Sequence, residues 1–220
     1  MYEDIAVIFD MDGVLADTGP IHFESWKKMA TQDAGVEFTR EFFEKTFGQQ
    51  TIPITKKLLG SKVSEHRIKN LADLKEEYYR EMVADELEPL PGVIDLIINL
   101  KKKKFKLAVG SSGPRKNVEL LLNSLHIQNH FDIVIAAEDI EKGKPAPDVF
   151  LHVANSINIP PKNCLVIEDA PVGIEAAKRA GMKTIALTTT HNKEELKEAD
   201  LIIENLTEVN VQKILKILKK

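Results

Sequence analysis

Near its N-terminus the chain reads Ile5-Ala6-Val7-Ile8-Phe9-Asp10-Met11-Asp12-Gly13-Val14-Leu15-Ala16-Asp17-Thr18, and this stretch fixes its architecture. The apolar run before Asp10 predicts a buried β-strand. Two carboxylates one residue apart follow that strand, and charges at such a position need a reason to be there. Ligands bind at the carboxyl ends of strands in open α/β sheets, and alternate residues of an extended chain point the same way. We therefore expect Asp10 and Asp12 to face one crevice, where a cation or a shared proton offsets their repulsion.

The composition of the 220 residues is that of an ordinary globular protein, with 43% hydrophobic and 29% charged residues. The formal net charge of −4 argues against a nucleic-acid partner. No apolar run approaches the roughly 18 residues of a membrane helix, and the N-terminus lacks a signal-peptide pattern, so no membrane partner is expected. The single cysteine, Cys164, cannot form an internal disulfide. We expect a cytoplasmic protein, with a monomer as the default state and Cys164 in the core.

Short apolar segments rich in β-branched residues alternate with amphipathic segments over most of the chain. The predicted strands are 5–9, 106–110, 132–136, 164–167, 184–187 and 201–203, and the predicted helices between them lie near 92–103, 114–125, 147–157, 171–180, 193–198 and 207–219. Continuous apolar strands of this kind are typical of a parallel sheet that is covered on both faces. The alternation therefore predicts an α/β fold with a doubly wound, Rossmann-like parallel sheet.

One region breaks this alternation. It contains several helical segments, 21–34, 39–46, 52–60 and 64–85, and no convincing strand. We therefore expect residues 1–16 and 88–220 to form an α/β catalytic core, and residues 17–87 to form a small all-helical cap inserted after the first strand. Because the insertion leaves from the end of the strand that carries Asp10 and Asp12, the cap is placed to fold over their crevice as a lid.

Three further clusters follow strands of the same predicted sheet. The turn Gly110-Ser111-Ser112-Gly113 suits a phosphate cradle, although such turns also cap helices. Lys144 lies between Gly143 and Pro145, in a constrained loop that fixes where its ammonium group points. Glu168-Asp169 is a second acidic pair at a strand end, and Asp169 is also a suitable N-cap for the next helix.

The acidic residues at the strand ends predict a metal site. The carboxylates expected in one crevice are those of Asp10, Asp12, Glu168 and Asp169. Such a cluster needs a hard cation, and oxygen ligands with room for water and phosphate oxygens suit Mg²⁺. Together with a hydroxyl and a lysine, these are the parts that phosphoryl transfer needs. Metal and lysine neutralise the equatorial oxygens while a positioned carboxylate attacks in line.

These residues, in this order, resemble the haloacid dehalogenase superfamily of phosphohydrolases along nearly the whole chain. The stretch 10–15 is similar to its first motif, Ser111 to its second, Lys144 to its third and Glu168-Asp169 to its fourth. The insertion after the first strand resembles the small helical cap of that superfamily. The resemblance implies that Asp10 attacks phosphorus and forms an aspartyl-phosphate. It also implies that Asp12 protonates the leaving alcohol and then deprotonates the water that releases phosphate.

The resemblance also implies which residues bind phosphate and metal. Ser111 and Lys144 would hold the phosphoryl group, with Ser112 from the same turn as a further candidate. Mg²⁺ would be bound by Asp10, Asp169 and the backbone carbonyl of Asp12, with Glu168 either in contact with the metal or behind its ligands. Asp12 also argues against dehalogenase chemistry and against phosphonate cleavage.

Within the superfamily, the chain is most similar to the β-phosphoglucomutase-like enzymes, which include mutases and phosphatases. Thr18 and His22 occupy positions that in the mutase contact the acid/base carboxylate, here Asp12, and Lys75 matches a lysine of the mutase cap. Read without the resemblance, His22 is a partly buried histidine and Lys75 a solvated helix residue. These three residues are therefore candidates for the cap side of the site.

One position departs from the mutase pattern. The mutase cap carries an arginine that grips the distal phosphate of the sugar, and the corresponding stretch here, Phe47-Gly48-Gln49-Gln50-Thr51-Ile52-Pro53, has Thr51 in its place. Losing a bidentate phosphate clamp is not a conservative change. The substitution favours a phosphatase, in which Gln49 and Gln50 are neutral residues that set specificity for a sugar or polyol.

These observations predict a Mg²⁺-dependent phosphatase that hydrolyses a small phosphorylated metabolite, a sugar or polyol phosphate, through an aspartyl-phosphate intermediate. The alternative is a phosphomutase of the β-phosphoglucomutase type, which Thr18, His22 and Lys75 favour. A non-catalytic scaffold with the same fold is a third and less favoured interpretation, because unused buried charges destabilise a protein.

Overall fold

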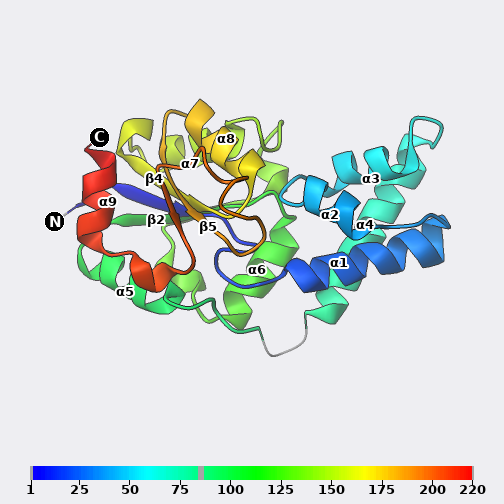
Figure 1. The fold of residues 1–220 in the computed structure, drawn as a ribbon, viewed down its shortest axis with the longest axis horizontal. Coiled ribbons are helices and arrows are strands. Elements are labelled where there is room, and N and C mark those ends of the chain that lie inside the picture. Colours follow the sequence, from blue (N-terminus) through cyan, green and yellow to red (C-terminus); the bar gives the residue numbers. More distant parts are fainter. Residues whose placement is uncertain (1, 84–86, 220) are drawn as a thin grey trace.

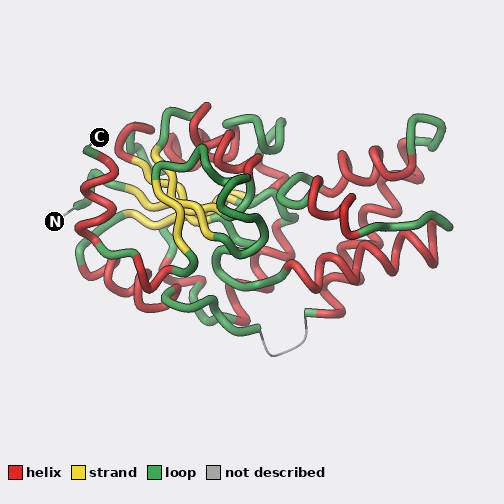
Figure 2. Tube along the Cα trace, in the orientation of Figure 1, coloured by secondary structure: helices red, strands yellow, loops and turns green. Residues whose placement is uncertain are grey.

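The computed structural model of the chain describes residues 2–83 and 87–219. Within them, six parallel strands form one sheet in the order β3-β2-β1-β4-β5-β6 (Figures 1 and 2). The strands are β1 (Ala6–Phe9), β2 (Lys106–Gly110), β3 (Ile133–Ile135), β4 (Cys164–Glu168), β5 (Lys183–Leu187) and β6 (Leu201–Ile203). The chain proceeds outward from β1 to one edge and then from β4 to the other edge. This is the predicted doubly wound α/β fold, whose ligand site lies where the strand order reverses.

Helices cover both faces of the sheet. They are α5 (Val93–Lys102), α6 (Arg115–Ser124), α7 (Asp148–Ser156), α8 (Pro171–Arg179) and α9 (Val211–Leu218), joined in places by 3₁₀ turns (Gln128–His130, Ala137–Asp139, Pro161–Asn163 and Leu206–Glu208). Alternate residues of β1 point to opposite faces of the sheet. Val7 and Phe9 pack with α5, α6 and α9, whereas Ala6 and Ile8 pack with α7 and α8. The central strands are therefore fully buried and hold the residues at their ends in fixed positions.

A second group of helices leaves the end of β1 and lies beside the sheet, far from both termini (Figure 1). It comprises α1 (Gly19–Lys28), a π-helical turn (Met29–Ala34), α2 (Arg40–Thr46), α3 (Thr51–Leu59) and α4 (Glu65–Met82). We call α1 to α4 the helical lobe. It has an apolar core of its own, rich in aromatic residues such as Trp26 and Phe43. Thr39 and Ser64 cap α2 and α4 by accepting from backbone N–H groups three residues on.

Two predicted helices differ from the structure. Residues 193–198 form turns and not a helix, because Leu196 is the only buried side chain among them and Asn192 caps the first turn through the N–H groups of Glu194 and Glu195. The last helix begins at Val211 and not at residue 207, because Asn210 caps it there. In the lobe, α4 is described to Met82, and the end of the helix predicted to reach residue 85 lies outside the described residues.

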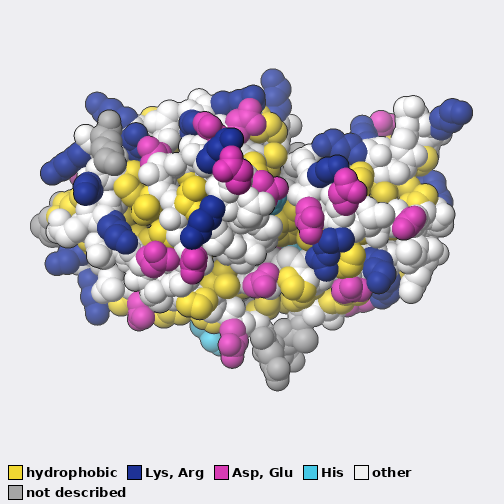
Figure 3. Space-filling view, viewed as in Figure 1, with side chains coloured by type: hydrophobic (Ala, Val, Ile, Leu, Met, Phe, Trp, Pro, Cys, Tyr) yellow, Lys and Arg dark blue, Asp and Glu magenta, His cyan; other side chains and the backbone are white. Residues whose placement is uncertain are grey.

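In the described parts of the chain, no helix combines the length and the apolarity that a membrane span requires. On the face shown in Figure 3, basic and acidic side chains are interspersed over both the α/β part and the helical lobe.

Candidate active site

The site begins where the two central strands end. Asp10 directly follows β1 and Glu168 is the last residue of β4, and these strands are paired so that Phe9 lies opposite Ile167. The N–H of Asp10 donates to the carbonyl of Ile167 at 2.9 Å, which extends the ladder by one residue. Asp10 and the acidic pair of β4 therefore meet at the point where the strand order reverses, which is where the fold places ligands.

Lys144 lies between these acidic residues. Its Nζ is 2.5 Å from Asp10 Oδ1 and 2.5 Å from Glu168 Oε1, and all three side chains are buried. The other oxygen of Glu168 accepts from the N–H groups of Asp169 and Ala170, at 2.9 and 3.0 Å. The ammonium group is thus fixed by two carboxylates, and one of these is fixed in turn by the backbone that starts α8.

Asp169 is held by groups that the sequence did not reveal. The hydroxyl of Thr190 donates to Asp169 Oδ2, and a ring nitrogen of His191 lies 3.1 Å from the Asp169 carbonyl oxygen. Gly13 has a φ of +74°, and a Cβ there would overlap the Asp169 carboxylate, so the loop after β1 needs glycine for both reasons. A signal for Thr190 does exist: it ends a run of three threonines just after β5, where ligands gather in such sheets.

Three carboxylates form a group suited to a metal ion. Asp10, Glu168 and Asp169 each offer an oxygen, and these atoms all lie within 4.8 Å of one another. Three negative charges there meet the single positive charge of Lys144. Burial and the neighbouring Glu168 carboxylate raise the pKa of Asp169 well above its ordinary value, and burial raises that of Asp10 against the opposing effect of Lys144. A divalent cation would balance this excess, and an all-oxygen donor set suits a hard one.

Asp12 lies in a different environment from Asp10. Its Oδ1 accepts from Thr18 Oγ1 at 2.5 Å and lies 3.1 Å from His22 Nε2. Burial favours the neutral carboxyl, but His22 and the Thr18 hydroxyl outweigh it and hold the pKa of Asp12 below its ordinary value. The structure thus brings together three of the four predicted carboxylates. The carboxylate of Asp12 lies outside that group. The prediction that Asp12 binds the metal therefore concerns only its backbone carbonyl.

His22 connects Asp12 to the interior of the lobe. Its Nδ1 lies 2.8 Å from the Nζ of Lys75, a fully buried lysine of α4, and Tyr79 stacks on its ring with centroids 4.1 Å apart. An ammonium group only donates, so Nδ1 is the acceptor and Nε2 is assigned the hydrogen that is donated to Asp12. Of the predicted cap residues, Thr18 and His22 therefore contact Asp12 directly, and Lys75 is connected to it through His22.

Glu76 is the centre of a second set of contacts. One carboxylate oxygen accepts from the Thr51 hydroxyl and from Lys75 Nζ, the latter at 3.1 Å. The other accepts from Asn117 Nδ2 at 2.6 Å, and Asn117 belongs to α6 of the α/β part. Glu76 therefore joins two segments of the lobe to the core. Sequence reasoning missed both Glu76 and Asn117, because a charged residue beside Lys75 on a polar helix is typical of a solvated surface.

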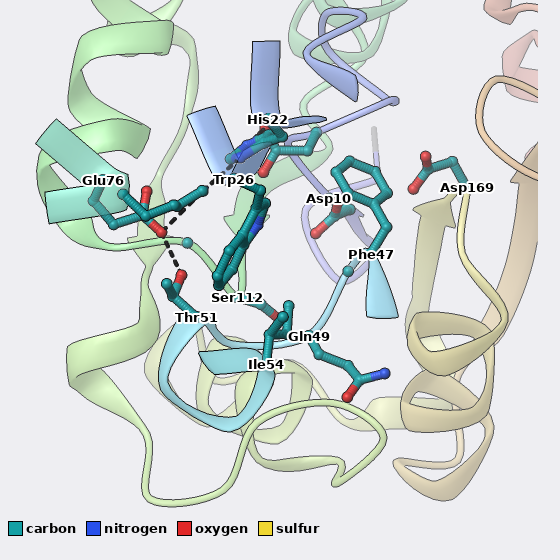
Figure 4. Close-up of a pocket in the computed structure, with 14 residues that line it drawn as sticks. Asp10, His22, Trp26, Phe47, Gln49, Thr51, Ile54, Glu76, Ser112 and Asp169 are labelled. Carbon is teal, nitrogen blue, oxygen red and sulfur yellow. Dashed lines mark hydrogen bonds and ion pairs between the residues drawn. The ribbon is translucent and has the colours of Figure 1, made fainter. Parts of the chain in front are cut away.

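A cavity lies between the acidic residues and the lobe (Figure 4). Asp10, Asp12 and Asp169 line one end, and the lobe contributes a wall; its lining residues there are His22, Trp26, Phe47, Gly48, Gln49, Thr51, Ile54, Lys75 and Glu76. Figure 4 shows Glu76 and Thr51 on one side, Asp10 and Asp169 on the other, and Trp26 between them. Both carboxylates after β1 thus face one crevice.

Only some of the residues predicted to bind phosphate or to set specificity line the cavity. Ser112 lines the cavity, and its buried hydroxyl has no hydrogen-bond partner among the described residues. Ser111 is buried, is not part of the described cavity lining, and accepts from the N–H of Gly113 at 3.0 Å through its hydroxyl. Gln49 lines the cavity, whereas Gln50 lies in an outer groove and packs against Gly143.

The chain is similar to known proteins over most of its length. Residues 7–187 match the family described as Haloacid dehalogenase-like hydrolase. A "Phosphorylated carbohydrates phosphatase" of Thermotoga maritima is 33% identical over 183 residues, which are 82% of this chain and 83% of that protein. A fructose-1-phosphate phosphatase of Escherichia coli is 34% identical over 186 residues, 84% of this chain and 97% of that protein. The crystal structure of a β-phosphoglucomutase from Clostridium difficile matches with a TM-score of 0.91 and 30% identity, covering 100% of this chain and 98% of that one.

Proposed function

The chain belongs to the haloacid dehalogenase-like hydrolase family, as its four motifs led us to expect, and from that premise we propose a Mg²⁺-dependent phosphatase acting on a small sugar or polyol phosphate. The observation that carries the proposal is that Asp10 and Asp12, although only one residue lies between them, are held by different partners. Asp10 is fixed by Lys144 beside the acidic pair of β4, whereas Asp12 is fixed by Thr18 and His22. One carboxylate is placed to attack, and the other to exchange a proton.

Asp10 is the proposed nucleophile. Lys144 holds its Oδ1 by a charge-assisted hydrogen bond and orients the carboxylate, while a buried ammonium at this point also attracts the phosphoryl oxygens. Attack by a carboxylate oxygen forms an O–P bond as the bond between phosphorus and the ester oxygen breaks, which leaves an aspartyl-phosphate and the alcohol. Ser111 and Ser112 are the proposed hydroxyl partners of the phosphoryl group.

The residues present fit the metal ion that this chemistry uses. Asp10 and Asp169 would hold it with the backbone carbonyl of Asp12, and Glu168 completes the acidic group. When bound, Mg²⁺ supplies positive charge to the phosphoryl oxygens. Thr190 fixes the carboxylate of Asp169, so that its orientation does not depend on the metal.

Asp12 is the proposed acid and base. Its Oδ1 takes both the Thr18 and the His22 contacts, which leaves Oδ2 to exchange a proton. In the first step it gives a proton to the departing ester oxygen, and in the second it takes one from the water that attacks the aspartyl-phosphate. The lowered pKa of Asp12 favours the second step, and a phosphate dianion near Oδ2 raises that pKa and favours the first.

We propose that the helical lobe is the cap of the enzyme, with residues 17–87 as the inserted segment and residues 1–16 and 88–220 as the catalytic core. Contacts from His22 to Asp12 and from Glu76 to Asn117 join the two parts over the cavity. A lid held closed in this way excludes bulk water and brings the acid/base into place.

A phosphatase fits the cavity better than a phosphomutase does. Thr51 stands where the mutase has an arginine, and its hydroxyl is bound to Glu76. Among the described residues that line the cavity, Lys75 is the one lysine or arginine, and it is already bound to His22 and Glu76. A mutase is the second candidate, because the fold matches a β-phosphoglucomutase closely and His22 connects Lys75 to Asp12.

Phosphate release and phosphorus NMR test the proposal together. With Mg²⁺, we expect free phosphate from a panel of sugar and polyol phosphates, loss of turnover on chelation, and no turnover by Asp10→Asn. The exposed Asp4→Asn is the matched control and keeps full activity. On β-glucose 1-phosphate, free phosphate supports the phosphatase and conversion to the 6-phosphate supports the mutase. Undiminished turnover by Asp10→Asn rules out the mechanism.

A further inference from the structure

We infer that Glu76 determines substrate specificity: its carboxylate admits a neutral, hydroxylated end of the substrate and rejects a second phosphate group. The inference rests on the proposed phosphatase function and narrows its substrate class to monophosphate esters with an uncharged carbon chain. Its basis is the position of Glu76 in the cavity, its fixed charge, and the scarcity of positive charge around it.

The position of Glu76 follows from the shape of the cavity. The reacting phosphate lies at Asp10, and Figure 4 shows Glu76 and Thr51 on the opposite side, with Trp26 between. A phosphate ester that reaches Asp10 therefore directs its other end towards Glu76. Trp26 lines the cavity on the way and offers apolar contact to the carbon chain.

The negative charge of Glu76 is fixed in place. Its side chain is only 7% exposed, and although burial favours the neutral form, Lys75 and the Thr51 hydroxyl hold its pKa below the ordinary value. Three donors, from Thr51, Lys75 and Asn117, reach its oxygens. A carboxylate accepts about four hydrogen bonds, so one acceptor position is left for a hydroxyl of the substrate.

The described lining of the cavity around Glu76 offers no free positive charge to a second phosphate. The guanidinium of Arg80, which lies nearby, is not part of that lining and donates to Asn117 Oδ1 at 3.0 Å. Lys75, the one cation among the described residues that line the cavity, is shared by His22 and Glu76. The outer groove meets the cavity at Thr51 and Ser112, and there the described lining includes the acids Asp73 and Glu138 and neither lysine nor arginine. Burial of a phosphate without a positive partner is strongly unfavourable. A neutral chain, in contrast, meets the open acceptor of Glu76 and the unpartnered hydroxyl of Ser112.

The test compares fructose 1-phosphate with fructose 1,6-bisphosphate, which differ only in the phosphate at the far end. We measure kcat/KM for total phosphate release and take the ratio of the two values. We expect the wild-type enzyme to prefer the monophosphate by about 100-fold or more, because buried groups left without a partner discriminate strongly between substrates. In Glu76→Gln, which keeps the shape and removes the charge, we expect this ratio to fall about tenfold. Glu76→Asp, which keeps the charge, is the matched control and retains the preference.

Glu76→Gln leaves the buried ammonium of Lys75 without its carboxylate and lowers stability, so its thermal unfolding is measured as well. A second variant therefore adds a positive charge and leaves Glu76 in place. Thr51→Arg places a guanidinium beside Glu76, and we expect it to lower the KM for the bisphosphate about tenfold. Thr51→Gln, neutral and of similar length, is the matched control and has no such effect.

The outcomes separate this inference from the proposed function. The inference is overturned if the wild-type enzyme hydrolyses the monophosphate and the bisphosphate equally well. It is also overturned if a folded Glu76→Gln variant keeps the ratio of the two kcat/KM values within about twofold of the wild-type ratio. If Glu76→Gln does not fold, an unchanged bisphosphate KM in Thr51→Arg overturns it. If the wild-type protein releases no phosphate from either fructose phosphate or from 4-nitrophenyl phosphate, the proposed function is overturned, and the inference with it.

Discussion

Two groups of charged residues face each other across the cavity, and they are built on opposite principles. The sheet-end cluster, Asp10, Lys144, Glu168 and Asp169, has three carboxylates for one ammonium group. The lobe-side network, His22, Thr51, Lys75, Glu76 and Asn117, pairs one lysine with one carboxylate and satisfies both with neutral partners. The first group is incomplete without a cation, whereas the second is already balanced. We therefore propose that the sheet-end cluster carries out the chemistry and that the lobe-side network selects among substrates.

The largest expected effect compares one lysine of each group. Lys144→Met removes the ammonium that orients Asp10 and attracts the phosphoryl group, and we expect kcat/KM for 4-nitrophenyl phosphate to fall about 10²–10³-fold. Lys75→Met reaches Asp12 only through His22, and losing that hydrogen bond to a charged group, about 1.5 kcal/mol, lowers the rate roughly tenfold. Steady-state kinetics of the two variants, each checked for folding by circular dichroism, measures the difference. Equal losses of kcat/KM in the two variants would show that the two groups contribute equally to the chemical step.

The sheet-end cluster was predictable because its members are neighbours of strands. A buried strand is visible as an apolar run, and parallel strands all end on one side, so Asp10 and Glu168-Asp169 had to meet. Lys144 came from its place in the family motif and from its constrained loop. Thr190 belongs to the same strand-end pattern, after β5, yet a run of threonines alone did not identify it.

The second prediction concerns the completeness of the sheet-end cluster. Thr190→Val removes the hydroxyl that holds Asp169, and we expect the dissociation constant for Mg²⁺ to rise about 10-fold or more, as for other groups that orient metal ligands. Titration calorimetry with Mg²⁺ measures it without turnover. Thr188→Val is the matched control, because that hydroxyl faces the carbonyl of Ile203, 3.5 Å away. A Mg²⁺ affinity that matches the wild-type value would show that Asp169 needs no support.

The third prediction concerns the joint between the lobe-side network and the core. Asn117→Ala removes the donor to Glu76 at 2.6 Å, leaves a buried carboxylate oxygen short of a partner and loosens the closed lobe. We expect the KM for a sugar phosphate to rise about fivefold and kcat to change less, because one hydrogen bond contributes about 1 kcal/mol. Asn123→Ala, an exposed position of the same helix, is the control. If kcat falls and KM is unchanged, the contact serves the chemical step and not closure.

The lobe-side network was predictable only in part, for a physical reason. Thr18, His22 and Lys75 were found by resemblance, but no local pattern marks Glu76 or Asn117, which come together through the packing of α4 against α6. A helix shows its buried face by apolar spacing, and α4 is polar over most of its length, so buried charges on it are indistinguishable from solvated ones. The misassigned helix at 193–198 has the same origin: charged residues with good helix propensity, and too little apolar surface to hold them.

The smallest expected effect on the site concerns Cys164, at the start of the strand that ends in Glu168. Burial raises the pKa of this thiol to about 12, so the folded protein keeps it neutral at pH 8 and it does not react with a disulfide reagent until the chain unfolds. An unfolded cysteine ionises near pH 8.5 to 9. Its contribution to the free energy of unfolding is therefore complete below that pH and is lost between about pH 9 and 12, by about 1.4 kcal/mol per pH unit. Denaturant unfolding of wild type and Cys164→Ala over this range isolates the term, since the other ionisable groups are common to both. A thiol that reacts in the folded protein at pH 8 would show that the strand frays from its start, and that the rigidity assigned to the sheet-end cluster does not extend along β4.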